Sequence, residues 1–122
     1  MLHHISLPVS DLARSRRFYE AALGALGYRC VAEADGFVGF GTEDGKDRLA
    51  LKERQPAIAA GEGFHLALAA PSPAAVARFH AAALRHGGVD NGPPGLRPQY
   101  GPGYCAAFVL DPDGHRLEAV HR

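Results

Sequence analysis

Two histidines and one glutamate are spaced so that they could bind a metal ion together. His4 and His65 each begin a segment in which bulky apolar residues alternate with small or polar ones, and Glu118 lies in a similar segment near the C-terminus. Such alternation is typical of strands. Neutral imidazoles and a carboxylate bind borderline divalent ions and leave positions open for water or substrate. Alternatively, the histidines are hydrogen-bonded structural residues and Glu118 pairs with Arg116 or Arg122.

An internal repeat places the two histidines at equivalent points. When the chain is compared with itself at the offset that puts His4 on His65, residues 4–27 align without gaps on residues 65–88. Further identities include Phe18/Phe79, Arg17/Arg78 and Gly27/Gly88. Two similar units, neither of which could bury its sheet alone, are therefore predicted to pack as one domain over residues 1–122.

Each unit is predicted to form a strand, a helix and three more strands. In the first unit, a helix follows Ser10 as its N-cap and ends near Gly27. In the second, Ser72 and Pro73 open the helix. The predicted strands are 4–9, 28–34, 37–41 and 48–53 in the first unit, and 64–69, 88–91, 104–110 and 115–120 in the second. The boundary falls in residues 54–63.

The helix faces predicted to point inward carry the apolar residues at helical spacing. They are Leu12, Tyr19, Leu23 and Leu26 in the first helix, and Val76, Phe79, Ala83 and Leu84 in the second. His80 is expected to be structural, His115 and His121 to be exposed, and His3 to point away from His4.

Composition narrows the classes of function. The 13 basic and 13 acidic residues cancel to a net charge of zero, which disfavours nucleic-acid binding. No apolar run approaches the length of a membrane span, and the N-terminus lacks the pattern of a signal peptide, so we expect a cytoplasmic protein without membrane partners. Cys30 and Cys105 lack metal or disulfide spacing and are expected to be small buried residues.

Three segments resemble the vicinal oxygen chelate superfamily, which includes glyoxalase I, extradiol dioxygenases, fosfomycin-resistance thiol transferases and bleomycin-resistance proteins. They are His-Ile-Ser-Leu-Pro-Val-Ser-Asp at 4–11, Arg-Phe-Tyr at 17–19 and Ala-Phe-Val-Leu-Asp-Pro-Asp-Gly-His-Arg-Leu-Glu at 107–118. The resemblance implies an α+β fold in which two βαβββ modules, approximately 1–57 and 63–122, form an open eight-stranded mixed cup with flanking helices. It also implies a divalent ion such as Fe, Mn, Zn or Ni, a small-molecule substrate and a homodimer.

Carried over residue by residue, the resemblance implies metal ligands at His4, His65 and Glu118. The ligand that glyoxalase I takes from the fourth strand falls on Ala50, which cannot bind a metal. This departure predicts little glyoxalase I activity. Glu53 could replace that ligand only if it faced the other side of its strand.

A stretch rich in glycine and proline, residues 91–103, is the remaining candidate. As a lid over the site, it would bring Arg97 and Gln99 to an anionic substrate, and Tyr100 and Tyr104 would offer hydroxyl groups as weak catalytic candidates. It could equally be a solvated connection.

The function predicted from these observations is a small metal-dependent enzyme. Its ion would act as a Lewis acid on a substrate that chelates through two oxygens. Isomerase, lyase, thiol transferase and dioxygenase chemistry all suit such a centre. The alternative is a non-catalytic protein of the bleomycin-resistance type that sequesters a small molecule.

Overall fold

The computed structural model describes all residues, 1–122. In chain order, the elements are β1 (Ile5–Val9), α1 (Leu12–Gly24), β2 (Arg29–Ala34), β3 (Phe37–Gly41), β4 (Leu49–Glu53), β5 (Leu66–Ala69), α2 (Pro73–Arg85), β6 (Val89–Leu96), a 3₁₀ turn at Pro98–Tyr100, β7 (Cys105–Leu110) and β8 (Arg116–His121). The predicted strand near 88–91 is therefore longer than expected. It takes in half of the stretch expected to be a lid.

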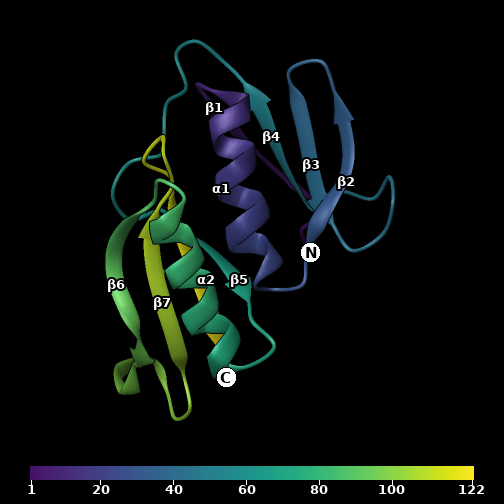
Figure 1. The fold of residues 1–122 in the computed structure, drawn as a ribbon. Coiled ribbons are helices and arrows are strands. Elements are labelled where there is room, and N and C mark those ends of the chain that lie inside the picture. Colours follow the sequence, from purple (N-terminus) through teal and green to yellow (C-terminus); the bar gives the residue numbers. More distant parts are fainter.

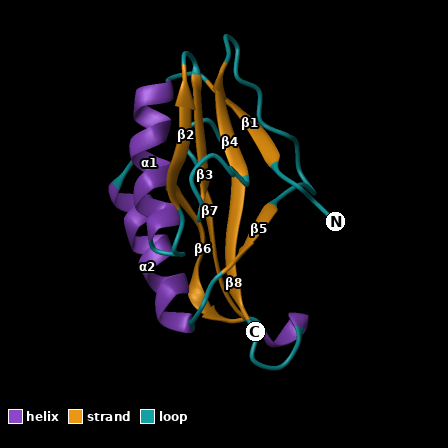
Figure 2. Cartoon of the chain, turned by 90° about the vertical axis from the view of Figure 1, so that its right-hand side faces the viewer, coloured by secondary structure: helices purple, strands orange, loops and turns teal.

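The eight strands form two four-stranded sheets, which confirms the predicted pair of βαβββ modules. The first sheet has the order β1-β4-β3-β2 and the second the order β5-β8-β7-β6. In each sheet the first and last strands of the module pair in parallel, as Ile5 does with Leu49 and Leu66 with Leu117. Both helices cover the same side of the sheets and pack against each other (Figures 1 and 2). Neither helix combines the length and apolar character needed to cross a membrane.

The helices begin where short polar side chains accept hydrogen bonds from free backbone amides. Ser72 caps α2 by accepting from the amide of Ala75, as predicted. The N-cap of α1 is Asp11, which accepts from the amide of Arg14, so the prediction of Ser10 was wrong. The hydroxyl of Ser10 instead donates to the carboxylate of Asp113 in the other module.

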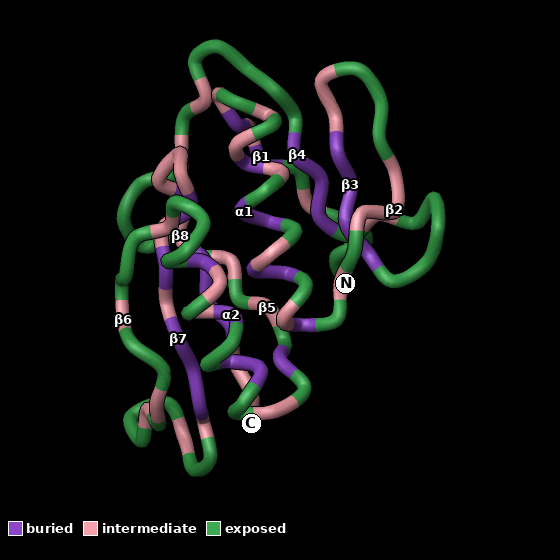
Figure 3. The backbone as a smooth tube through the Cα atoms, in the orientation of Figure 1, coloured by how far each residue is buried: buried purple, intermediate pink, exposed green.

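One continuous core lies between the helices and both sheets (Figure 3). Its largest fully buried side chains include Phe18, Tyr19, Phe40, Phe79 and Leu117. Two predictions about burial were wrong. Leu84 of α2 is 40% exposed because it lies beyond the inward face, and Cys30 is only half-buried on β2, whereas Cys105 is buried.

The modules are joined at one end by the turn between β7 and β8. The buried Tyr19 hydroxyl donates to the Asp111 carboxylate over 2.7 Å. The Ser10 amide donates to Asp113, and His115 Nε2 lies 2.6 Å from the Pro8 carbonyl oxygen. His115 is therefore buried, in contrast to the prediction of exposure, because it reaches a carbonyl of the other module. We call the turn of residues 111–115 and its partners the module joint.

Candidate functional site

The strand register gathers one set of side chains on the face of the second sheet that points away from the helices. Glu118 of β8 lies opposite Ala67 on β5 and opposite Phe108 on β7, so these three residues share that face. His65 precedes Ala67 by two residues, and alternation puts it on the same side. Glu118 and His65 therefore point to the same side of the second sheet.

The Glu118 carboxylate is the centre of this face. The residue is only 1% exposed, and its two oxygens have separate partners. His65 Nε2 lies 2.9 Å from Oε2, and the Tyr104 hydroxyl donates to Oε1 over 2.5 Å. The alternative in which Glu118 pairs with an arginine is wrong. Arg116 donates to the Ala60 carbonyl, and the Arg122 guanidinium lies over the Tyr104 ring at 5.7 Å.

The hydrogen bond to Glu118 also determines the protonation state of Tyr104. Because the carboxylate accepts its hydrogen, the pKa of Tyr104 is raised to about 12. Tyr104 is therefore protonated at neutral pH and acts as a donor. As a general base at neutral pH it would be ineffective.

An open pocket of about 330 Å³ lies against this carboxylate. It is lined by His65, Tyr100, Tyr104, Phe108 and Glu118, and the two tyrosine rings meet edge to face at 5.3 Å. The sequence analysis missed Phe108 as a wall of this site. Its register opposite Glu118 is the signal that could have found it.

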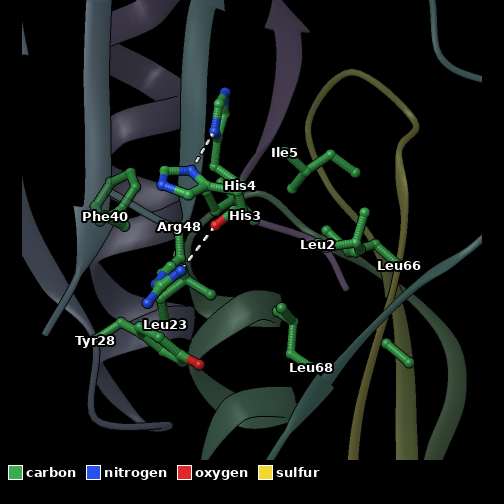
Figure 4. A pocket seen from close by; sticks show the side chains of 12 residues that line it. Leu2, His3, His4, Ile5, Leu23, Tyr28, Phe40, Arg48, Leu66 and Leu68 are labelled. Atoms are coloured by element: carbon green, nitrogen blue, oxygen red, sulfur yellow. Dashed lines mark hydrogen bonds between the residues drawn. The ribbon is translucent and has the colours of Figure 1, made fainter. Parts of the chain in front are cut away.

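His4 does not lie with His65 and Glu118 in this single chain. It is exposed, just before β1, and its Nδ1 is 2.9 Å from Nδ1 of His3, so the prediction that His3 points away was wrong. Both histidines line a second cavity together with Arg48 (Figure 4). No three His, Cys, Asp or Glu side chains are grouped closely enough in this single chain to hold a metal ion. The structure thus brings together His65 and Glu118 and leaves His4 apart.

Ala50 and Glu53 lie on opposite faces of β4, as predicted. Ala50 lies opposite Ser6 and Gly39, on the first-sheet face that corresponds to the face of Glu118 in the second. Glu53 accepts a hydrogen bond from the amide of Leu12 at the start of α1. It therefore points toward the helix and away from Ala50.

The residues of the predicted lid are partly engaged in the second sheet. Arg97 donates to the carbonyls of Gly95 and Pro93, and its guanidinium lies 5.5 Å from the centre of the Phe108 ring. Arg97 therefore stabilises the irregular strand β6 through these hydrogen bonds. Gln99 is exposed in the 3₁₀ turn beside Tyr100, close to the mouth of the pocket.

The comparisons with known proteins agree with the fold. The family model of the Glyoxalase/Bleomycin resistance protein/Dioxygenase superfamily matches residues 1–119. A glyoxalase/bleomycin resistance protein from Albidiferax ferrireducens is 33% identical, with a TM-score of 0.86 over 98% of this chain and 97% of that one. The search of curated proteins found no match.

Two further solved structures share the fold. A glyoxalase-related enzyme from Fulvimarina pelagi has a TM-score of 0.76 at 23% identity, over 100% of this chain and 88% of that one. A glyoxalase I mutant from Zea mays has a TM-score of 0.72 at 25% identity, and the match covers 96% of this chain but 45% of the plant protein. The chain belongs to the glyoxalase/bleomycin resistance protein/dioxygenase superfamily.

Proposed function

We propose that this protein is a divalent-metal-dependent enzyme that acts on a small substrate chelating through two oxygens. His65 and Glu118 would supply two ligands, and His4 of the partner subunit would supply the third in a homodimer. The observation that carries the proposal is the almost fully buried Glu118 carboxylate, held by His65 and Tyr104 at the wall of an open pocket.

The donor set fits a borderline divalent ion. A carboxylate and an imidazole already lie 2.9 Å apart, and Glu118 is buried without an arginine or lysine to neutralise it. A buried carboxylate is costly unless it is paired or coordinates a metal. A bound divalent ion would satisfy this requirement and would act as a Lewis acid on the substrate oxygens.

The sheet edges support a site shared between two copies. Within one chain, β1 and β5 are edge strands, and His4 and His65 each directly precede one of them. Unpaired strand edges favour association with another chain. If the β1 edge of one copy lay beside the β5 edge of another, His4 would approach His65 and Glu118. Two-fold symmetry would then create two equivalent sites.

Tyr104 has a defined part in this proposal. In the single chain its hydroxyl occupies Glu118 Oε1, and its pKa of about 12 keeps it protonated. If Glu118 Oε1 served as a metal ligand, the Tyr104 hydroxyl would be free to point into the pocket. Tyr104 would then donate a hydrogen bond to a substrate oxygen, while Tyr100 and Phe108 would exclude water from one side.

Metal binding tests the proposal directly. We expect about one divalent ion per chain in protein purified without chelator or metal-affinity tag, measured by elemental analysis. His65→Ala and Glu118→Gln should abolish tight binding in calorimetry. His86→Ala is the matched control, because His86 is the exposed C-cap of α2 and its side chain contacts only the Ala82 carbonyl. Unchanged affinity in both site variants would refute the proposed centre.

Mixing variants tests whether two chains share the site. His4→Ala and Glu118→Gln are each expected to lose binding alone. After unfolding and refolding together in equal amounts, they should regain about a quarter of the wild-type sites, because each mixed dimer contains one intact site. Binding that is never restored, with dimers present, would contradict the shared site.

The alternative function, sequestration of a small molecule without catalysis, makes a different prediction. A binding protein needs no ion, so a metal content near zero, together with ligand binding that chelators leave unchanged, would favour it. Metal-dependent turnover would exclude it.

A further inference from the structure

A second cavity, which we call the intermodule cavity, opens between the two modules. Its volume is about 320 Å³, and nine of its twelve lining residues are hydrophobic. Leu23 and Phe40 line it from the first module, and Leu66 and Leu68 line it from β5 of the second. In Figure 4 these two groups of apolar side chains face each other across the opening. It shares no residue with the pocket at Glu118.

The cavity exists because the modules are tied together at one end only. The hydrogen bonds between the modules belong to the module joint, which contacts the end of β1, the start of α1 and Tyr19 in the middle of that helix. Leu23 lies at the other end of that helix, where β1 and β5 do not pair. Apolar side chains of both modules therefore line an opening there.

The polar groups of the cavity are basic or neutral. Arg48, His3 and His4 are the three lining residues outside the hydrophobic nine, which include Tyr28, and no aspartate or glutamate lines the cavity. The Arg48 guanidinium makes no ion pair, and its one hydrogen bond, from Nη1, goes to the His3 carbonyl over 3.0 Å. The arginine thus keeps donors free for an anionic group at the cavity.

We propose that the intermodule cavity binds a small apolar carboxylate. The acyl chain or ring would lie between Leu23, Phe40 and Leu68, and the carboxylate would accept hydrogen bonds from Arg48. An apolar cavity of about 150 Å³ holds a benzene molecule, so this larger volume holds a ligand of roughly ten non-hydrogen atoms. Mostly apolar walls with a few fixed polar groups are the usual composition of a small-molecule site.

Three probes of equal length test both parts of the site. Octanoate, octan-1-ol and octylamine carry the same chain with an anionic, a neutral and a cationic head group. In titration calorimetry at pH 7 on the full-length protein, we expect octanoate to bind at least tenfold more tightly than octan-1-ol and octylamine to bind least. No octanoate binding, or octylamine binding as tight as octanoate binding, would overturn the proposal.

Substitutions in the cavity test where octanoate and octan-1-ol bind. Arg48→Met should weaken octanoate binding at least tenfold and change octan-1-ol binding less than twofold. Arg78→Gln, which removes another exposed charge, on α2, should change neither. Leu68→Trp fills the cavity and should abolish binding of both probes. Octanoate affinity unaltered by Arg48→Met would refute the site even if Leu68→Trp failed to fold.

His4 lines this cavity and is also the proposed third metal ligand, so variants of Glu118 and Arg48 are used to separate the two proposals. The Glu118→Gln variant should bind octanoate as the wild type does, and Arg48→Met should retain its metal. Octanoate binding that was lost in Glu118→Gln would place the probe at the wrong site and overturn the inference.

Discussion

Removing one hydroxyl at the module joint should reveal how much that joint contributes to stability. Tyr19→Phe deletes only the group that donates to Asp111 over 2.7 Å. The ring, fully buried and packed edge to face on Phe18, keeps its contacts. A hydrogen bond to a charged group contributes about 1.5–3 kcal/mol, so we expect the free energy of unfolding at pH 7 to fall by about 2 kcal/mol.

The size of this loss should depend on pH. Burial raises the pKa of the Asp111 carboxyl above its usual value, and the Tyr19 hydroxyl gives the strongest opposing effect. Without the hydroxyl, this pKa rises further in the folded state only. As pH falls below the folded pKa the Asp111 carboxyl becomes protonated, and the loss should shrink to about 1 kcal/mol, the contribution of a neutral hydrogen bond. The deficit then grows as pH rises through the folded pKa.

Urea unfolding of wild type and Tyr19→Phe at a series of pH values from about 3 to about 7 measures both quantities. Tyr28→Phe is the matched control, because this half-buried tyrosine has no hydrogen-bond partner for its hydroxyl and should lose less than about 0.5 kcal/mol. A Tyr19→Phe loss equal to that of the control, or one that does not change with pH, would refute this account of the joint.

Three further outcomes follow from burial, capping and hydrogen bonding. Leu23→Ala should cost about 2–5 kcal/mol in urea unfolding, whereas Leu84→Ala should cost less than about 1 kcal/mol because its side chain is 40% exposed; equal losses would contradict the core boundary. Ser72→Ala should cost about 1 kcal/mol through loss of the α2 N-cap, and Ser72→Gly distinctly less, with thermal unfolding as the measurement. In an absorbance titration, Tyr104→Phe should remove one phenol that ionises near pH 12. The hydrogen bond from Tyr104 to Glu118 stabilises the fold below a pH of about 10, and this stabilisation is lost as pH rises through 12. A titration curve that Tyr104→Phe leaves unchanged above a pH of about 11 would refute the bond.

Local sequence patterns predicted the elements well because each depends on residues close in the chain. The repeat gave two modules, and alternation placed Glu118 on the same face as His65. The pair Ser72 and Pro73 identified the start of α2 because the cap and the amide it serves lie within one turn.

The errors arose where a side chain found its partner far away in sequence. Ser10 has the chemistry of an N-cap, but its hydroxyl donates to Asp113 across the joint, and Asp11 caps α1 instead. His115 follows a turn and looked exposed, yet it is buried against the Pro8 carbonyl. Nothing near either residue in the sequence signals these contacts.

The candidate site was predictable in part for the same reason. His65 and Glu118 belong to paired strands of one module, so the strand pattern was sufficient to bring them together. The position of His4 depends on how one module lies against the other, or against a second copy, and this relation is set by packing that no local pattern encodes. The metal site that joins all three remains a prediction.

The two sheets share no hydrogen-bonded strand pair, and this has a consequence for how the molecule unfolds and folds. Every strand pairing stays within one half of the chain, so no backbone ladder has to break when the two halves part. Each half can therefore behave as its own cooperative unit in native-state hydrogen exchange, with the central strands β4 and β8 protected longest. During folding, each half forms its parallel strand pair from residues of that half alone, and the shared core is completed when the two halves dock.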